Sequence, residues 1–178
     1  ACTLPSPRVY GYRHRARLHA ALRGGVASFG FFRSGSKVVI PAGSCPVLHP
    51  SLDAAVHALA AVARRHPAAF AGCAHVRADT GWDGSVVRLI LRGARGERID
   101  LQASVVRAVQ AAAGSGVGVH LDDDCPPLAL GPGEDALAST GETFTQINLT
   151  QNLALVATAL ELAAPQPGEA VLDVYCGL

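Results

Sequence analysis

The residues best suited to chemistry lie near the end of the sequence, in residues 144–148 (Phe-Thr-Gln-Ile-Asn) and 171–177 (Val-Leu-Asp-Val-Tyr-Cys-Gly). The second stretch is mostly apolar and ends at Gly177, which predicts a buried parallel strand followed by a glycine turn. Ligands of open α/β sheets bind at that end of a strand. By itself, the pattern is typical of a Rossmann-like site for a nucleotide or S-adenosylmethionine.

A helix is expected between these two stretches. Apolar residues recur at nearly helical spacing within residues 147–164, and Pro165 ends the pattern. They are Leu149, Leu153, Val156, Leu160 and Leu162. Residues 165–168 then form a tight link into the expected strand.

The same two stretches together resemble the RNA uracil-5 methyltransferases, in which an F-x-Q-x-N segment precedes an L-D-L-[FY]-C-G motif. Residues 10–18 (YGYRHRARL) are similar to the W-G-Y-R-x-[RK]-x-R segment of that family. Residues 30–36 (GFFRSGS) and 45–48 (CPVL) are similar to its G-F-x-[RK]-x-G-S … C-P-[IV]-L segment. The four matches follow the family's order and extend over nearly the whole chain, although the middle matches only in general pattern.

The resemblance implies an S-adenosylmethionine-dependent enzyme that forms 5-methyluridine, and we expect ribosomal RNA as its substrate in preference to transfer RNA. In this family a cysteine attacks C6 of a uracil that is flipped out of the RNA, C5 takes the methyl group, and a base removes the C5 proton. That cysteine and that base lie well downstream of the L-D-x-x-C-G motif. We therefore expect the catalytic residues beyond Leu178 and none within this chain. Cys176 stands where the family has a structural cysteine.

The resemblance also implies binding roles for three residues. Gln146 would contact the cofactor and the target base, Tyr175 would lie beside the methyl donor, and Phe144 would pack against the flipped base. Ordinary structural roles are the alternative. Phe144 would then anchor a core, and Gln146 and Asn148 would be polar residues at a helix start, where Asn is a good N-cap.

The charge distribution points to an anionic partner more clearly than the net charge of +1 does. Seven basic residues precede the first carboxylate, Asp53: Arg8, Arg13, Arg15, Arg17, Arg23, Arg33 and Lys37. On a strand, Arg13, Arg15 and Arg17 would share one face, because side chains alternate with a period of two. Together with nearby aromatic residues, such a row suits RNA phosphates and bases. The alternative is a solvated strand face.

Hydrophobic patterns predict an α+β domain over residues 1–138, built on a hairpin-based sheet with two helices. The Gly24-Gly25 pair marks the hairpin turn. Strands are expected at 15–23, 26–32, 37–40, 70–78, 85–92 and 117–121, and helices at 50–66 and 99–113. Residues 139–178 would then begin a Rossmann-like methyltransferase domain with its first helix and first strand.

The cysteines and acidic residues predict no metal site. The five cysteines are widely spaced and form no C-x-x-C motif, so we expect free thiols. Some members of the resembled family hold an iron–sulfur cluster with an upstream C-x5-C-G-G-C run and a cysteine of the C-P-[IV]-L segment. Because that run is absent, Cys45 is a candidate fourth ligand only in a longer protein. Asp122–Asp124 is interpreted as a solvated loop.

Three further expectations concern context. No apolar run reaches the roughly 20 residues that cross a bilayer, which predicts a cytoplasmic protein without membrane association. The sequence contains no Met, even at position 1, so we expect a piece of a longer protein. Two other functions stay open: an RNA-binding module without catalysis, and a methyltransferase that acts on a substrate other than RNA.

Overall fold

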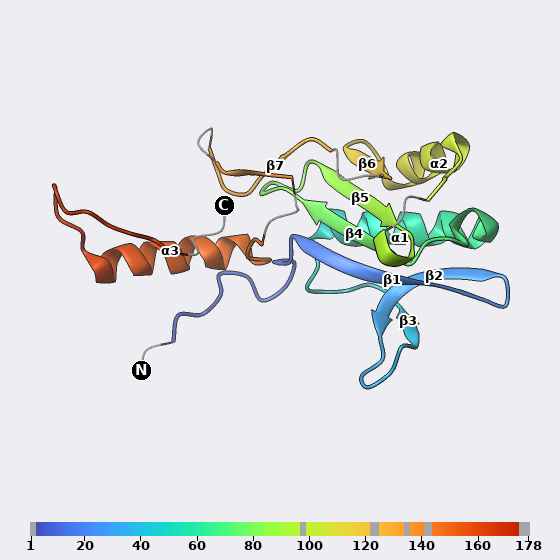
Figure 1. Ribbon diagram of the computed structural model, residues 1–178, viewed down its shortest axis with the longest axis horizontal. Coiled ribbons are helices and arrows are strands. Elements are labelled where there is room, and N and C mark those ends of the chain that lie inside the picture. The colour runs from blue at the N-terminus through green and yellow to red at the C-terminus, as the bar shows by residue number, and fades with distance from the viewer. Residues whose placement is uncertain (1–2, 97–98, 122–124, 134–135, 141–143, 175–178) are drawn as a thin grey trace.

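The computed structural model describes residues 3–96, 99–121, 125–133, 136–140 and 144–174. Its centre is a six-stranded sheet with the order β3-β2-β1-β4-β5-β6 (Figure 1). Neighbouring strands are antiparallel, except that β5 and β6 are parallel. The strands are β1 (Arg15–Arg23), β2 (Val26–Phe32), β3 (Val39–Pro41), β4 (His75–Thr80), β5 (Val87–Arg92) and β6 (Val117–His120).

The hairpin of β1 and β2 forms where the sequence predicts it. Gly24 and Gly25 have φ angles of 56° and 76°, which a two-residue hairpin turn with positive φ at both positions requires. Glycine has no Cβ atom and adopts this conformation without strain. Both strands match their expected bounds residue for residue.

Two helices cover one face of the sheet and bury the core against it. Helix α1 (Pro50–Arg65) begins with His49 as its N-cap, whose side chain accepts a hydrogen bond from the Ser51 N–H, and with Pro50 in the first turn. Its apolar side chains recur every three or four positions and are buried. Helix α2 (Ala103–Ala113) packs against α1 and β6.

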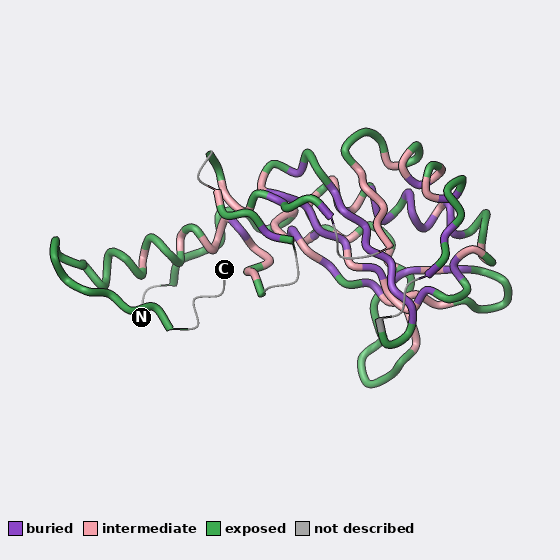
Figure 2. Tube along the Cα trace, turned by 45° about the horizontal axis from the view of Figure 1, so that its top comes forward, coloured by how far each residue is buried: buried purple, intermediate pink, exposed green. Residues whose placement is uncertain are grey.

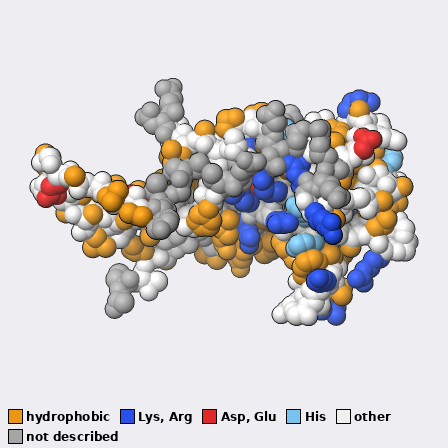
Figure 3. Space-filling view, viewed as in Figure 1, with side chains coloured by type: hydrophobic (Ala, Val, Ile, Leu, Met, Phe, Trp, Pro, Cys, Tyr) orange, Lys and Arg blue, Asp and Glu red, His pale blue; other side chains and the backbone are white. Residues whose placement is uncertain are grey.

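Among the described residues, no helix covers the opposite face of the sheet (Figure 1). Along β1, Ala16 and Leu18 are buried on the helix side, whereas Arg17 between them is exposed. Figure 3 shows Lys, Arg and His side chains gathered over the strands of the face toward the viewer, while α1 lies behind the strands in the matching ribbon view. The period-two pattern thus separates an apolar face from a cationic one.

The chain after β6 extends away from this body. A two-stranded ribbon of β7 (Leu128–Ala129) and β8 (Ala138–Ser139) leads to α3 (Leu149–Ala163), which projects from the sheet (Figures 1 and 2). Most of the apolar side chains of α3 are exposed, including Leu155, Leu160 and Leu162. Among the described residues, no helix is both long and apolar enough to span a membrane.

Three expected elements differ by more than two residues from the structure, and the bounds of several others shift by one or two residues. Strand β4 begins at His75, not at residue 70, because Pro67–Phe70 forms a 3₁₀ turn after α1. Helix α2 begins at Ala103, so residues 99–102 are not helical. The strand expected at 171–176 is wrong for residues 171–174, which are exposed coil; no described strand lies beside them to supply hydrogen bonds. Another 3₁₀ turn spans Ala94–Gly96.

Candidate functional site

Three of the motif segments, far apart in sequence, meet around Arg13 and His14. The Arg13 N–H donates to the Val47 carbonyl, and the His49 N–H donates to the Arg13 carbonyl, each at 2.9 Å. The His14 N–H donates to the Ile147 carbonyl at 2.9 Å, and Arg13 also forms a β-bridge with Asn148. The backbone of residues 11–14 therefore ties segment 45–48 to segment 144–148.

His14 is the buried residue at this junction. Its side chain is 4% exposed, Nδ1 lies 2.9 Å from the Tyr12 carbonyl oxygen, and Nε2 has no hydrogen-bond partner among the described residues. The His49 ring lies 5.1 Å from it, centroid to centroid. Burial lowers the pKa of His14 below the usual 6.5, because the charged imidazolium loses solvation.

We expect this buried histidine to make the fold less stable in acid. Since the pKa of His14 is lower in the folded state, the unfolded chain binds the additional proton as the pH falls below about 6.5, and the free energy of unfolding decreases. Urea unfolding at about pH 7 and about pH 5 should show this loss. His14→Gln should show a smaller loss, although His19, His49 and His75, whose pKa values are also lowered, still contribute. Equal losses in both proteins would contradict this prediction.

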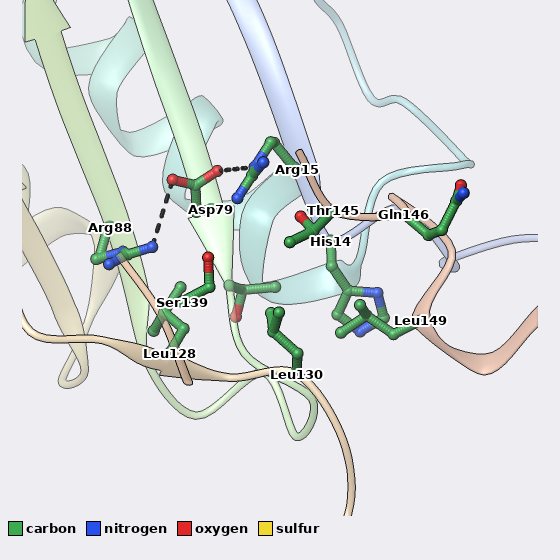
Figure 4. A pocket seen from close by; sticks show the side chains of 11 residues that line it. His14, Arg15, Asp79, Arg88, Leu128, Leu130, Ser139, Thr145, Gln146 and Leu149 are labelled. Carbon is green, nitrogen blue, oxygen red and sulfur yellow. Dashed lines mark hydrogen bonds and ion pairs between the residues drawn. The ribbon is translucent and has the colours of Figure 1, made fainter. Parts of the chain in front are cut away.

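Asp79 lies on β4 and is surrounded by three arginines, of which Figure 4 draws Arg15 and Arg88. One carboxylate oxygen accepts from Arg15 Nε at 2.8 Å, and the other accepts from Arg77 Nε at 3.0 Å and lies 3.6 Å from Arg88 Nη2. Asp79 and Arg88 are each about 2% exposed, whereas Arg15 and Arg77 keep about a fifth of their side chains accessible. The carboxylate therefore holds one fully buried guanidinium and two that reach the surface.

Arg88 is the most deeply buried of these arginines. Its Nη1 donates to the Pro126 carbonyl at 2.7 Å and lies 3.4 Å from the Cys125 sulfur, while Nε has no partner among the described residues. A buried arginine requires a counter-ion, and the pairing of β4 with β5 places Asp79 directly opposite. The ion pair joins β4 to β5, and the hydrogen bond from Arg88 to the Pro126 carbonyl holds the loop after β6 against the sheet.

The three arginines predicted to contact RNA have different surroundings. Arg13 donates from Nε to the Arg15 carbonyl at 2.9 Å, and Arg15 is paired with Asp79. Arg17 is exposed on the sheet face without a helix. Their RNA contacts stay a prediction, for which Arg17 is the most accessible of the three.

Thr145 and Gln146 line a small cavity together with His14, Arg15 and Asp79 (Figure 4). Its volume of about 10 Å³ is enough for about one water molecule. In Figure 4 the Gln146 side chain points away from the Asp79 group. S-adenosylmethionine does not fit this cavity. Tyr175 and Cys176 lie outside the described residues.

The structure tests two structural roles that the sequence left open: Phe144 as a core anchor and Asn148 as a helix N-cap. Phe144 is 77% exposed, so it is not a core anchor within the described chain. Asn148 is the N-cap of α3: its side-chain oxygen accepts from the Gln151 N–H at 3.0 Å, as predicted. Its amide nitrogen donates to the Ser6 hydroxyl at 3.0 Å, which joins the beginning of the chain to the start of α3.

No disulfide joins the described cysteines, Cys45, Cys73 and Cys125. Burial raises the pKa of Cys73 to about 11, which keeps its thiol protonated and unreactive. Cys45 is half-buried, and its N–H donates to the Asp53 carboxylate at 2.9 Å. Over the described ranges, no three His, Cys, Asp or Glu side chains cluster as metal ligands. Asp122–Asp124 lies outside those ranges.

Sequence reasoning did not identify Asp79 and Arg88 as site residues. The sequence carried two signals for them: a carboxylate within the strand pattern of β4 and an arginine within the apolar run of β5. Charged side chains in such buried positions occur almost only in pairs. Which charge would face which depends on the strand register. The pairing of β1, β4 and β5 was needed to bring them together.

Comparison with curated proteins finds relatives along the full chain. The 23S rRNA (uracil(1939)-C(5))-methyltransferase RlmD of Pseudomonas fluorescens is 31% identical over 190 aligned positions, which cover 100% of this chain and 40% of that protein. The protein of the same name from Verminephrobacter eiseniae is 35% identical, covering 95% of this chain and 37% of its own length. The chain thus spans about two fifths of these relatives.

A solved structure shares the fold. The Pyrococcus abyssi tRNA (uracil-54, C5)-methyltransferase, solved in complex with S-adenosyl-L-homocysteine, matches 89% of this chain and 42% of its own chain with a TM-score of 0.64 and 15% sequence identity. No family model matches the sequence.

Proposed function

This chain belongs to the RNA (uracil-C5)-methyltransferase family, of whose curated members it spans about two fifths, and we propose that the protein containing it methylates C5 of a uridine in ribosomal RNA. The observation that carries this proposal is the match, along the whole of this chain, to part of a 23S rRNA methyltransferase. The assembly of segments 11–14, 45–48 and 144–148 into one junction supports it, since the motifs of the resemblance form a single structural unit.

We further propose two functional regions. Residues 1–138 would form the RNA-facing domain, and residues 139–178 would begin the Rossmann-like domain that holds the cofactor. The exposed apolar side chains of α3 support this division, because a helix with uncovered leucines normally packs against further structure. The Asn148 cap and the His14–Ile147 hydrogen bond would then fix the angle at which α3 leaves the first domain.

S-adenosylmethionine would supply the activated methyl group when bound. Gln146 would provide one wall of its site, because a side-chain amide can donate and accept at once. Tyr175 would complete that side. Neither residue changes its protonation during the reaction, so their contribution would be orientation of the cofactor and the target base.

Phe144 would receive the target base. C5 and C6 of a stacked uracil are not accessible to an enzyme, so the base must leave the stack. A ring that is 77% exposed beside the Gln146 segment offers a surface on which an extruded base can stack. The nucleophile and the general base are expected outside this chain.

The test is methyl transfer by the protein containing this chain, with labelled S-adenosylmethionine and 23S ribosomal RNA, followed by nucleoside analysis for 5-methyluridine. Gln146→Ala should lower the rate by about a hundredfold, because misplaced reactants lose about that factor. Gln102→Ala is the matched control, since Gln102 is an exposed residue at the start of α2 whose side chain makes no capping hydrogen bond. No 5-methyluridine in any uridine-containing RNA would overturn the proposed function and favour a non-catalytic RNA-binding module.

A further inference from the structure

The sheet face opposite the helices carries rows of side chains that the strand register aligns across β1, β4 and β5; this face is buried along β5 and accessible at Arg17 on β1. One row contains Arg15, Asp79 and Arg88, and the next contains Arg17, Arg77 and Ile90. The third contains His19, His75 and Arg92. Rows repeat about every 6.7 Å along the strands. We call Arg17, His19, Phe32, His75 and Arg77 the cationic face.

Like charges lie opposite each other on this face. Arg17 is the direct cross-strand neighbour of Arg77. Such pairs destabilise a sheet. Among the described members of the three rows, Asp79 is the one carboxylate, and it lies at one end. Like charges placed together raise the positive electrostatic potential at the centre of this face, and that potential attracts an anion.

The charges that surround His75 are also positive. Burial lowers the pKa of His75, and the positive charges of Arg17, His19, Arg92 and Arg77 lower it further. The pKa of His19 is likewise lowered, by burial and by Arg17. An anion bound across these side chains would relieve this mutual repulsion.

An aromatic surface adjoins the charges. The rings of His19 and Phe32 are stacked, with centroids 3.7 Å apart and planes inclined by 17°. Phe32 remains 43% exposed, so its ring is accessible beside Arg17 and His19. Proteins that bind single-stranded nucleic acids usually combine basic side chains along the phosphates with aromatic rings on which the bases stack.

The cationic face is continuous with the candidate site. Arg77 donates to the Thr140 carbonyl at 3.5 Å as well as to Asp79, and the Asp79 row lines the cavity with Thr145 and Gln146. Figure 3 shows basic side chains over the strands at the centre of this face. A nucleic-acid strand bound along these rows would therefore lead toward residues 144–148, which include Gln146.

We propose that the cationic face binds a single-stranded segment of the RNA substrate, with phosphates along Arg17 and Arg77 and one base stacked on Phe32. The proposal rests on the proposed function for the choice of RNA as the anion. Unpaired bases are required because stacked duplex bases cannot reach a ring on the sheet.

Fluorescence anisotropy with this chain, without methyl donor, and a short end-labelled single-stranded RNA tests the proposal. Arg17→Gln should weaken binding about three- to tenfold and reduce the salt dependence by about one phosphate contact. Phe32→Ala should weaken binding about tenfold or more. Phe32→Tyr should retain the affinity, because it keeps the ring and separates stacking from any general loss of structure.

Two matched controls lie away from this face. Arg64→Gln removes an exposed charge from α1, behind the sheet, and Phe31→Ala removes a partly exposed ring of opposite orientation on the same strand. Both should bind RNA as the unmodified chain does. Unchanged binding by Arg17→Gln and Phe32→Ala, equal losses in the controls, or equally tight binding of duplex RNA would overturn the proposal. Weaker binding by Arg17→Gln and Phe32→Ala, with unchanged binding by the two controls, would support the proposal. It would do so even if no methyl transfer were found, because the absence of methyl transfer contradicts only the proposed function.

Discussion

Replacing Asp79 with Asn is expected to lower the free energy of unfolding by about 3–5 kcal/mol, the usual cost of leaving a buried charge without its partner. Arg15 and Arg77 can turn toward water when the carboxylate is lost, because about a fifth of each side chain is exposed. Arg88 cannot, since it is 1% exposed, and the Pro126 carbonyl would be its remaining oxygen partner among the described residues. Urea unfolding followed by circular dichroism measures the change.

Two further variants identify the cause. Asp83→Asn makes the same chemical change at an exposed carboxylate and should cost much less. Asp79→Asn combined with Arg88→Met should recover about 1–3 kcal/mol relative to Asp79→Asn alone, because the stranded charge is gone. A cost below about 1 kcal/mol for Asp79→Asn, or no recovery in the double variant, would show that Asp79 does not compensate Arg88.

Leu59→Ala in α1 is expected to lower the free energy of unfolding by about 2–5 kcal/mol. Leu59 is fully buried between α1 and the sheet, so the substitution removes apolar contacts and leaves a cavity. The same urea unfolding experiment measures the effect. Because α1 supports the sheet from behind, RNA binding by this variant should fall only where the chain begins to unfold.

Leu162→Ala is the matched control, since it makes the same change in a helix at a residue that is 82% exposed. It should alter stability by no more than about 0.5 kcal/mol. Equal costs at the two leucines would mean that the core does not lie between α1 and the sheet. In the protein containing this chain, a larger cost at Leu162 would instead indicate that further structure covers α3.

The residues that we expect to stabilise the fold and those that we expect to bind RNA lie mainly on opposite faces of one sheet. Leu59 and its neighbours hold the helix side together, whereas Arg17 and Phe32 contribute to the open side and can be changed without disturbing the core. Asp79 belongs to both, because it neutralises a buried arginine and ends the cationic rows beside Gln146. We therefore expect Arg17 and Phe32 variants to separate RNA binding from folding, and Asp79 variants not to.

The sequence by itself determined the local elements and the family. The Gly24-Gly25 turn, the alternation of β1 and the helical spacing of α1 follow from short-range backbone and burial preferences, so their bounds could be predicted closely. The Asn148 cap is local in the same sense. The four motif segments indicated the family because they preserve residue types in a fixed order, and the relatives confirm it.

The tertiary structure decided which of these residues meet. Arg13, Arg15 and Arg17 are equivalent by spacing, yet Asp79 from a strand more than sixty residues away pairs with Arg15 and leaves Arg17 exposed. The predicted strand after α3 fails over residues 171–174 because a strand needs neighbours to satisfy its backbone, and the described chain offers none there. Charge pairing and sheet formation depend on register between distant segments, which local sequence patterns do not encode.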